Sequence, residues 1–119
     1  MRALAPGLAA VALLAGCAAP TWDADVGPLL VGECSGCHGG AEPEAGFVLE
    51  GRDDIVDVPA TQADMLLVTP GDSLDSYLWH KLANTQAIAG GSGSAMPQGQ
   101  VLDDLDVELV GDWIEGGAR

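Results

Sequence analysis

Apolar residues recur at helical spacing in three parts of the chain. The first part runs from about Asp25 to Cys37, where Pro28 suits the first turn of a helix and Leu29 and Leu30 follow it. Gly39-Gly40 then provides a stop signal. This pattern predicts a first helix over residues 25–37.

A second helix is predicted from about Ser73 to Asn84, after the break at Pro70-Gly71. Asp72 or Ser73 can cap its amino end, and Asp75 in its first turn favours the positive end of the helix dipole. Four apolar residues recur on one face of this helix: Leu74, Tyr77, Leu78 and Leu82. We expect that face to be buried.

A third helix is predicted from about Asp104 to Glu115. Acidic residues crowd its first turn, and Gly116-Gly117 stops it. Four residues are spaced to pack inward: Leu109 with Trp113, and Val110 with Ile114.

The segments between these helices are predicted to be loops. Residues Ala41 to Val58 are acidic and rich in turn residues, with Phe47 to Leu49 as an apolar insert and a short helix expected near Asp53 to Val58. Residues Ala87 to Ala95 are rich in Gly and Ser and predict a flexible loop. The fold class predicted is therefore all-α, as one small domain of about three main helices with long loops.

The amino-terminal residues have the form of an export signal. Arg2 precedes an apolar run from Ala3 to Ala15 that is too short to span a bilayer. It ends in Leu14-Ala15-Gly16-Cys17, which resembles the lipobox of bacterial lipoproteins and implies cleavage before Cys17 and lipid on its sulfur. The domains expected are a signal peptide at residues 1–16, a lipid-anchored tether at 17–25 and a folded domain at 26–119. The alternative is a cleaved, soluble periplasmic protein in which Cys17 is incidental.

The charge of the chain is strongly negative. Its 119 residues carry a formal net charge of −14, and removing Arg2 with the leader gives −15 (−14 minus +1). Such a chain repels nucleic acid phosphates, so nucleic acid is excluded as a partner. The charge favours docking to a basic patch on another protein. The alternative is that the acidic residues only aid solubility.

The stretch Cys34-Ser35-Gly36-Cys37-His38 has the spacing of a c-type haem attachment site. Each thiol can add to a haem vinyl group, and the adjacent imidazole can take one axial position on the iron. The same cysteines could instead bind zinc, which would need His80 as a fourth ligand, or form a disulfide. The haem interpretation accounts for all three cysteines of the chain, because Cys17 is then the lipid site.

A low-spin haem iron needs a second axial ligand, and three residues are candidates. Met65 lies in the apolar run Met65 to Val68, which we expect to pack under the haem, where Met usually fills space. His80 lies in the middle of the second predicted helix and is expected to be partly exposed. Met96 follows the predicted flexible loop and precedes Pro97, which fixes the backbone beside it. Met96 is the predicted ligand.

Taken together, these motifs resemble a small monohaem cytochrome c related to class I, of the branch called planctomycete-type cytochrome c. The matching stretches are Pro28-Leu29-Leu30, Cys34 to Gly39, Pro70-Gly71-Asp72, Ser76, Leu78, Lys81-Leu82, Met96-Pro97 and Trp113 to Ala118. The resemblance implies a cytochrome c-like domain around one covalent haem c, with its iron, in each chain. It implies that Cys34 and Cys37 bind the haem, that His38 and Met96 are the axial ligands, and that the first and last helices cross near Trp113.

Two positions depart from better-known class I members. Those members place Gly and an aromatic residue two turns and one turn before the first Cys, where this chain has Val26 and Leu30, with Gly27 one place off. They also orient the proximal His through a Pro carbonyl, and Pro43 is too close to His38 in sequence for that role. The sequence therefore leaves the hydrogen-bond partner of the His38 ring unassigned.

The function expected is a one-electron carrier that transforms no substrate. It is expected to act as a monomer on the periplasmic side of a membrane, anchored through Cys17, and Ala18 after that residue permits sorting to an outer membrane. One alternative is a haem enzyme or gas sensor with an open sixth site, such as a peroxidase. A second is a structural module held by zinc or a disulfide.

Overall fold

A computed structural model of the chain describes residues 18–34, 38, 47–99 and 101–119. In chain order the elements are a π-helical turn η1 (Trp22–Val26), α1 (Gly27–Cys34), a short 3₁₀ turn η3 (Arg52–Asp54), α2 (Tyr77–Ala83) and α3 (Asp104–Glu115). Within the described ranges the extended segments form only isolated bridges and no strand. The all-α prediction with three main helices is confirmed.

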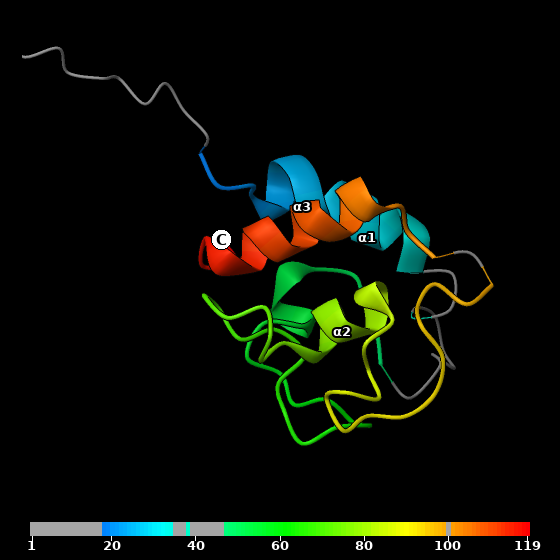
Figure 1. The fold of residues 1–119 in the computed structure, drawn as a ribbon. Coiled ribbons are helices and arrows are strands. Elements are labelled where there is room, and N and C mark those ends of the chain that lie inside the picture. The colour runs from blue at the N-terminus through cyan, green and yellow to red at the C-terminus, as the bar shows by residue number, and fades with distance from the viewer. Residues whose placement is uncertain (1–17, 35–37, 39–46, 100) are drawn as a thin grey trace, which may run out of the picture.

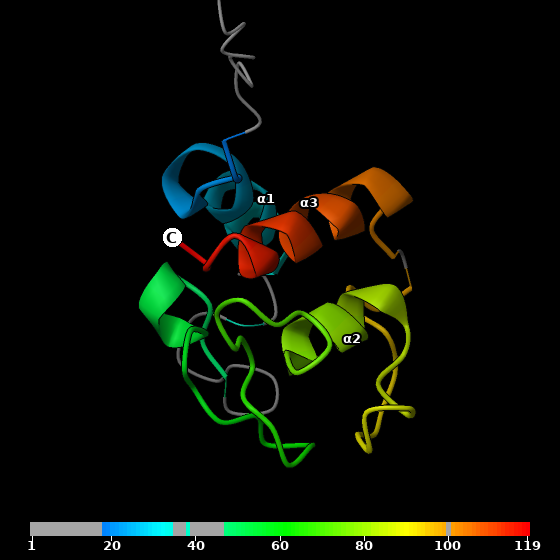
Figure 2. The same cartoon turned by 60° about the vertical axis from the view of Figure 1, so that its left-hand side comes forward.

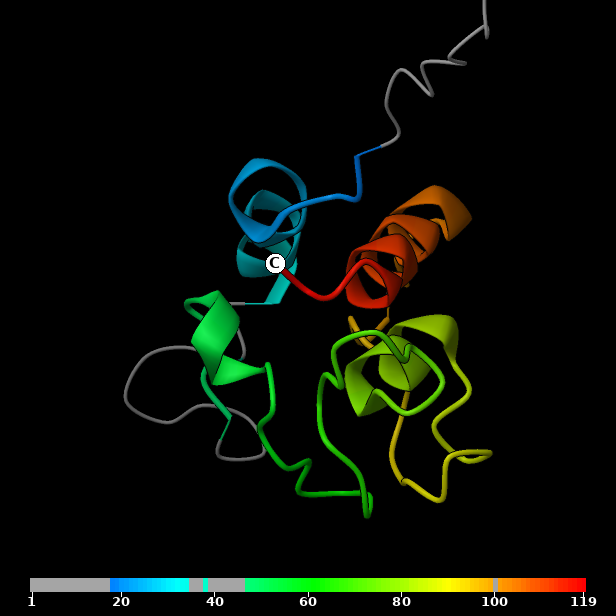
Figure 3. The same ribbon diagram turned by 90° about the vertical axis from the view of Figure 1, so that its left-hand side faces the viewer.

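η1, α1 and α3 lie together at one end of the molecule, and α2 lies below them among the loops (Figure 1). η1 continues into α1, α3 lies beside them, and α2 lies against α3 (Figure 2). Figure 3 shows η1 and α1 on one side and α3 on the other, with the loops between η3 and α2 below them. The last residues return to η1, where the Trp22 amide donates to the Arg119 carbonyl oxygen at 2.7 Å.

The first helix begins earlier than the sequence predicts. Thr21 caps it, because its hydroxyl oxygen accepts from the Ala24 amide at 3.3 Å while its own amide donates to the Asp25 carboxylate at 2.9 Å. Pro28 lies in the first turn of α1, as expected. Residues 35–37, with which the predicted helix ended, lie outside the described residues.

Trp113 of α3 occupies the centre of the core, with none of its side chain exposed. Its ring centroid lies 5.7 Å from that of Trp22 in η1, and its Nε1 donates to the Arg119 carbonyl oxygen at 2.9 Å. Val26 and Leu30, which replace the Gly and the aromatic residue of better-known cytochromes, are fully buried in the same core. The expected contact between the first and last helices is thus made by apolar side chains and a pair of indoles.

Gly27 allows Trp22 to pack against the start of α1. A β-carbon at Gly27 would lie 2.7 Å from the Trp22 carbonyl oxygen and 2.9 Å from its indole ring. Any larger residue would therefore push the indole away from its place beside Trp113.

The second helix is shorter than predicted, since α2 begins at Tyr77 and not near Ser73. The Ser76 hydroxyl donates to the Asp72 carbonyl oxygen at 2.7 Å and accepts from the Thr69 amide at 2.8 Å. These local bonds hold Ser76 in an extended conformation and compete with an earlier helical turn. Leu74 therefore lies outside the helix and is 69% exposed, so the prediction that it joins the buried face was wrong.

The remaining three residues of that face, Tyr77, Leu78 and Leu82, are buried as predicted. The third helix has the predicted bounds. Asp103 caps it by accepting from the Asp106 amide at 2.9 Å. Val110, Trp113 and Ile114 are buried, and Leu109 packs against the core.

The short helix expected near Asp53 to Val58 is the 3₁₀ turn η3, which lies slightly earlier. The Asp54 carboxylate accepts from the Glu50 and Gly51 amides, both at 2.8 Å, and this fixes the start of the turn. None of the described helices is long and apolar enough to cross a bilayer. The predicted signal peptide and Cys17 lie outside the described residues.

Gly27→Ala is expected to destabilise the protein by about 1–3 kcal/mol, because the new methyl group overpacks the contact with Trp22. Gly32→Ala is the matched control, since Gly32 is in the same helix and a β-carbon there meets no atom within 4 Å. Gly32→Ala is expected to stabilise by roughly 0.5–1 kcal/mol through helix propensity. Urea denaturation measures both, and equal effects would contradict the packing account.

Glu115→Gln is expected to lower stability at pH 7 but much less in acid. The Glu115 carboxylate accepts from the Ser73 hydroxyl at 2.7 Å and from the Ser73 amide at 2.9 Å. These bonds lower the pKa of Glu115 below its ordinary value of 4.5. Their contribution is present above pH 4.5 and is lost as the pH falls through the lower value of the folded state.

Thermal unfolding of both proteins between pH 7 and pH 3 measures this difference. Glu108→Gln removes the same charge from an exposed position of α3 and is the control. A destabilisation by Glu115→Gln that does not shrink in acid would show that the two bonds are not responsible.

Candidate functional site

A cavity of about 550 Å³ lies between the end of α1, the Phe47 to Leu49 segment and α2. This size falls within the range of sites that hold cofactors in proteins. Its walls are largely apolar and include Phe47, Leu49, Leu67, Leu78 and Leu82. Three of the predicted site residues also line it: Cys34, His38 and Met96.

Cys34 is the last residue of α1, so the helix delivers its sulfur to the edge of the cavity. The His38 amide donates to the Cys34 carbonyl oxygen at 2.8 Å, which continues the helical spacing from one residue to the other. Cys37 lies outside the described residues.

The His38 ring is held by Phe47. Its Nδ1 donates to the Phe47 carbonyl oxygen at 3.2 Å, and the two ring centroids lie 4.7 Å apart. A carbonyl oxygen can only accept, so Nδ1 is the ring nitrogen that carries the proton of this bond. The Leu49 amide also donates to the His38 carbonyl oxygen, at 2.6 Å, which fixes the backbone. Of the two ring nitrogens, Nε2 is therefore the one that could act as a metal ligand.

Met96 reaches the same cavity from the loop after α2. Its amide donates to the Lys81 carbonyl oxygen at 3.0 Å, so α2 fixes the place where the loop returns. Met65 is partly buried and is not among the residues that line the cavity. Of the run expected to pack under a haem, Leu67 does line the cavity, while Val68 is buried in the core.

His80 is used elsewhere. Its Nε2 donates to the Leu74 carbonyl oxygen and its Nδ1 is paired with the Thr85 hydroxyl, both at 2.7 Å. Only 7% of this residue is exposed, so the prediction of a partly exposed helix residue was wrong. His80 does not line the cavity. Its ring ties both ends of α2 to the neighbouring loops.

The loop after α2 is tied to that helix at several points. Lys81 Nζ donates to the carbonyl oxygens of Ser92 and Ser94, at 2.8 and 2.9 Å. The Tyr77 hydroxyl donates to the Ser92 carbonyl oxygen at 3.3 Å, and Gln86 Nε2 donates to that of Gly93 at 3.2 Å. Burial lowers the pKa of Lys81. The second half of the predicted flexible loop is thus held by two side chains of α2, Tyr77 and Lys81, and by Gln86, which follows the helix.

The family model described as planctomycete cytochrome C matches residues 34–97. The match begins at the first cysteine of the attachment motif and ends at Pro97, directly after Met96. The chain belongs to the planctomycete cytochrome c family. No curated protein and no solved structure gives a significant match.

Membership of this family implies a covalently attached haem with its iron. The cavity of this cytochrome fits that group, because a thiol, an imidazole and a thioether line a largely apolar pocket. A zinc site is a poor fit, since His80, its required fourth ligand, is engaged away from the cavity. Across the described ranges, no three His, Cys, Asp or Glu residues are grouped as they would be around a metal ion.

Two residues that shape the cavity of this cytochrome were missed from the sequence. Phe47 holds the His38 ring through its backbone carbonyl, a group that every residue carries. The sequence therefore showed only that Phe47 belongs to a short apolar segment. Lys81 belongs to one of the matching stretches, but the sequence assigned it no structural role. It is the only lysine of this acidic chain, and that could have indicated a specific role.

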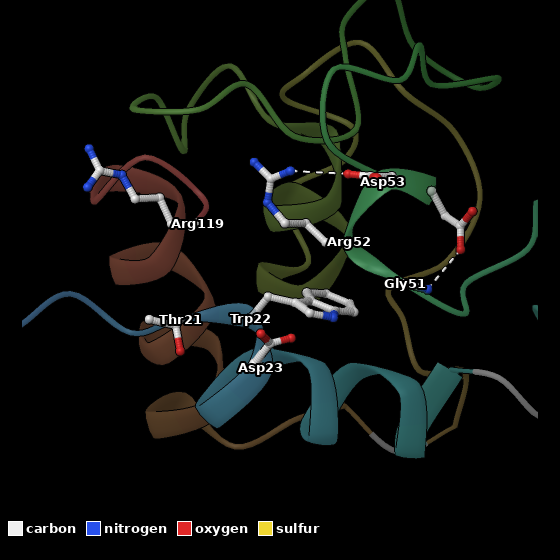
Figure 4. Close-up of a pocket in the computed structure, with 8 residues that line it drawn as sticks. Thr21, Trp22, Asp23, Gly51, Arg52, Asp53 and Arg119 are labelled. Atoms are coloured by element: carbon white, nitrogen blue, oxygen red, sulfur yellow. Dashed lines mark hydrogen bonds and ion pairs between the residues drawn. The ribbon is translucent and has the colours of Figure 1, made fainter.

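A second, shallower pocket of about 530 Å³ lies between η1 and η3. Figure 4 shows Trp22 and Asp23 on its η1 side and the Arg52–Asp53 ion pair, with 3.2 Å between charged atoms, on its η3 side. Arg52 Nε also donates to the Ala118 carbonyl oxygen. None of the predicted haem ligands of the cytochrome lines this pocket.

Proposed function

We propose that this cytochrome is a membrane-tethered, periplasmic one-electron carrier whose iron is ligated by His38 and Met96. The observation that carries the proposal is that both side chains line one apolar cavity at which Cys34 also ends α1. One haem per chain accounts for the whole of that ligand set.

Cys34 and Cys37 would hold the haem, each through one sulfur–carbon bond to a vinyl carbon, with the thiol hydrogen going to the other vinyl carbon and no oxidant needed. His38, next to Cys37 in the chain, would hold the iron through Nε2, because its Nδ1 is bonded to the Phe47 carbonyl oxygen.

The haem supplies an iron that takes one electron from a reduced partner protein and gives it to an oxidised one. The residues of the chain set how readily this happens. A thioether ligand from Met96 favours the ferrous state and raises the potential above that of an iron with two His ligands. The apolar walls, among them Leu67, Leu78 and Leu82, would surround the haem with a medium of low polarity.

The tether and the charge define where the carrier works. Lipid on Cys17, which follows the lipobox-like sequence, would anchor the domain to a membrane on its periplasmic side. The acidic mature chain, acting as a monomer, would dock through charge to a basic patch on its redox partner. No reaction on a substrate is required of any residue.

The optical spectrum of the protein purified from a host with haem-attachment machinery tests the ligand set. The ferric wild type is expected to be low-spin with a methionine–iron charge-transfer band. Met96→Ala is expected to abolish that band, while His80→Gln, the control, retains it. A high-spin wild-type spectrum that Met96→Ala leaves unchanged would favour an enzyme or gas sensor with an open sixth site.

The salt dependence of electron exchange tests the docking proposal. Small redox complexes of opposite charge serve as probes: a cationic ammine complex of ruthenium and anionic ferricyanide. Raising the ionic strength is expected to slow the reaction with the cation and to speed up that with the anion. Rates with both probes that do not respond to salt would contradict electrostatic steering.

A further inference from the structure

We propose that Lys81 is a positioning residue for Met96, because one residue of α2 holds the loop before Met96 through its ammonium and Met96 itself through its carbonyl. The inference rests on the proposed function, since it presumes that Met96 binds the iron. It assigns to Lys81 control over the strength of the bond between iron and methionine.

The contacts converge on a five-residue stretch. Lys81 Nζ donates to the carbonyl oxygens of Ser92 and Ser94, at 2.8 and 2.9 Å, and the Lys81 carbonyl oxygen accepts from the Met96 amide at 3.0 Å. The side chain and the backbone of one residue therefore fix three points within residues 92–96. These bonds hold the backbone of Met96 at the cavity that its side chain lines.

Lys81 is buried, and its bonds to the loop carbonyls offset the cost of removing its ammonium from water. Only 8% of the residue is exposed, and burying an ammonium is unfavourable unless it is paired or hydrogen-bonded. The chain has 18 acidic residues, yet among the described residues the one ion pair is that of Arg52 with Asp53. The Lys81 ammonium is thus satisfied by two loop carbonyls, and bonds from a charged donor are about twice as strong as neutral ones.

The loop before Met96 is rich in glycine, so bonds from another part of the chain are needed to fix its backbone. Gly90, Gly91 and Gly93 lie within five residues, and glycine loses more backbone freedom than any other residue when it is ordered. Ordering that takes place when a ligand binds weakens the binding, whereas ordering in advance strengthens it. A thioether on an unrestrained glycine loop would therefore bind iron weakly, and the three bonds of Lys81 remove that disadvantage.

Tyr77 and Gln86 assist from either side. A β-carbon at Gly91 would lie 2.3 Å from the Tyr77 ring, so the loop lies directly on that ring. The Tyr77 hydroxyl and Gln86 Nε2 donate to the carbonyl oxygens of Ser92 and Gly93. These neutral bonds reach the loop only before Ser94, which leaves Lys81 as the residue whose contacts extend to Met96.

Cyanide binding to the ferric, haem-loaded protein tests the inference, because cyanide must displace Met96 and so reports the strength of its bond to iron. Lys81→Leu keeps an apolar stem, removes the ammonium and introduces no sulfur that could bind iron at the cavity, which Lys81 also lines. It is expected to weaken the methionine–iron charge-transfer band and to tighten cyanide binding at least about tenfold, since it removes two hydrogen bonds from a charged group. Lys81→Arg, which keeps charged donors, is expected to restore part of the wild-type value.

Arg52→Gln is the matched control. It also removes a cation that donates to a backbone carbonyl, that of Ala118, but at the second pocket, which Met96 does not line (Figure 4). It is expected to lower the melting temperature and to leave both the band and the cyanide affinity unchanged. A merely structural role for Lys81 would give the same result in both variants.

Three results would overturn the inference, and they separate it from the proposed function. Unchanged cyanide affinity in Lys81→Leu, with a normal band in the wild type, overturns the role of Lys81 alone. Equal tightening in Arg52→Gln does the same. A wild type without the band overturns both the role of Lys81 and ligation by Met96. If Lys81→Leu does not retain haem, Lys81→Gln replaces it with the same expected and contrary outcomes.

Discussion

The hydrogen bond from His38 Nδ1 to the Phe47 carbonyl oxygen determines which chemistry the cavity can support. It fixes the ring tautomer and the orientation of an imidazole at the wall of the cavity. The main-chain acceptor comes from a segment that also contributes Leu49 to the core, which links the orientation of His38 to the folding of the domain. The cavity and the apolar core of this small protein are therefore parts of one packing arrangement.

Helix α2 organises the other side of the cavity. Leu78 and Leu82 line it, while Lys81 holds the loop that carries Met96. His80 of the same helix bonds through its two ring nitrogens to Leu74, which precedes α2, and to Thr85, which follows it. The seven residues of α2 thus form an apolar wall of the cavity, hold the loop that follows and bond to the segments on either side of the helix.

The sequence predicted the parts that depend on local pattern. The bounds of α3 follow from its acidic first turn and its closing glycines. Cys34, His38 and Met96, which the sequence singled out, line one cavity. The predicted start of α2 was wrong, because hydrogen bonds of Ser76 with Asp72 and Thr69 favour an extended backbone where the apolar spacing predicted a helical turn. The acceptor for His38 is a backbone carbonyl, and backbone groups are the same in every residue. Such long-range contacts become visible only once the chain is folded.

We propose that His38 and Met96 bind a haem iron from opposite sides in this cavity. Proton NMR of the reduced protein with labelled methionine methyl groups tests it directly, since Met65 and Met96 are the only methionines after the predicted leader. An axial methionine lies over the porphyrin ring, whose ring current shifts its methyl signal far upfield. We expect one signal with this shift, assigned to Met96, and one at an ordinary position. Two signals at ordinary positions would contradict the claim.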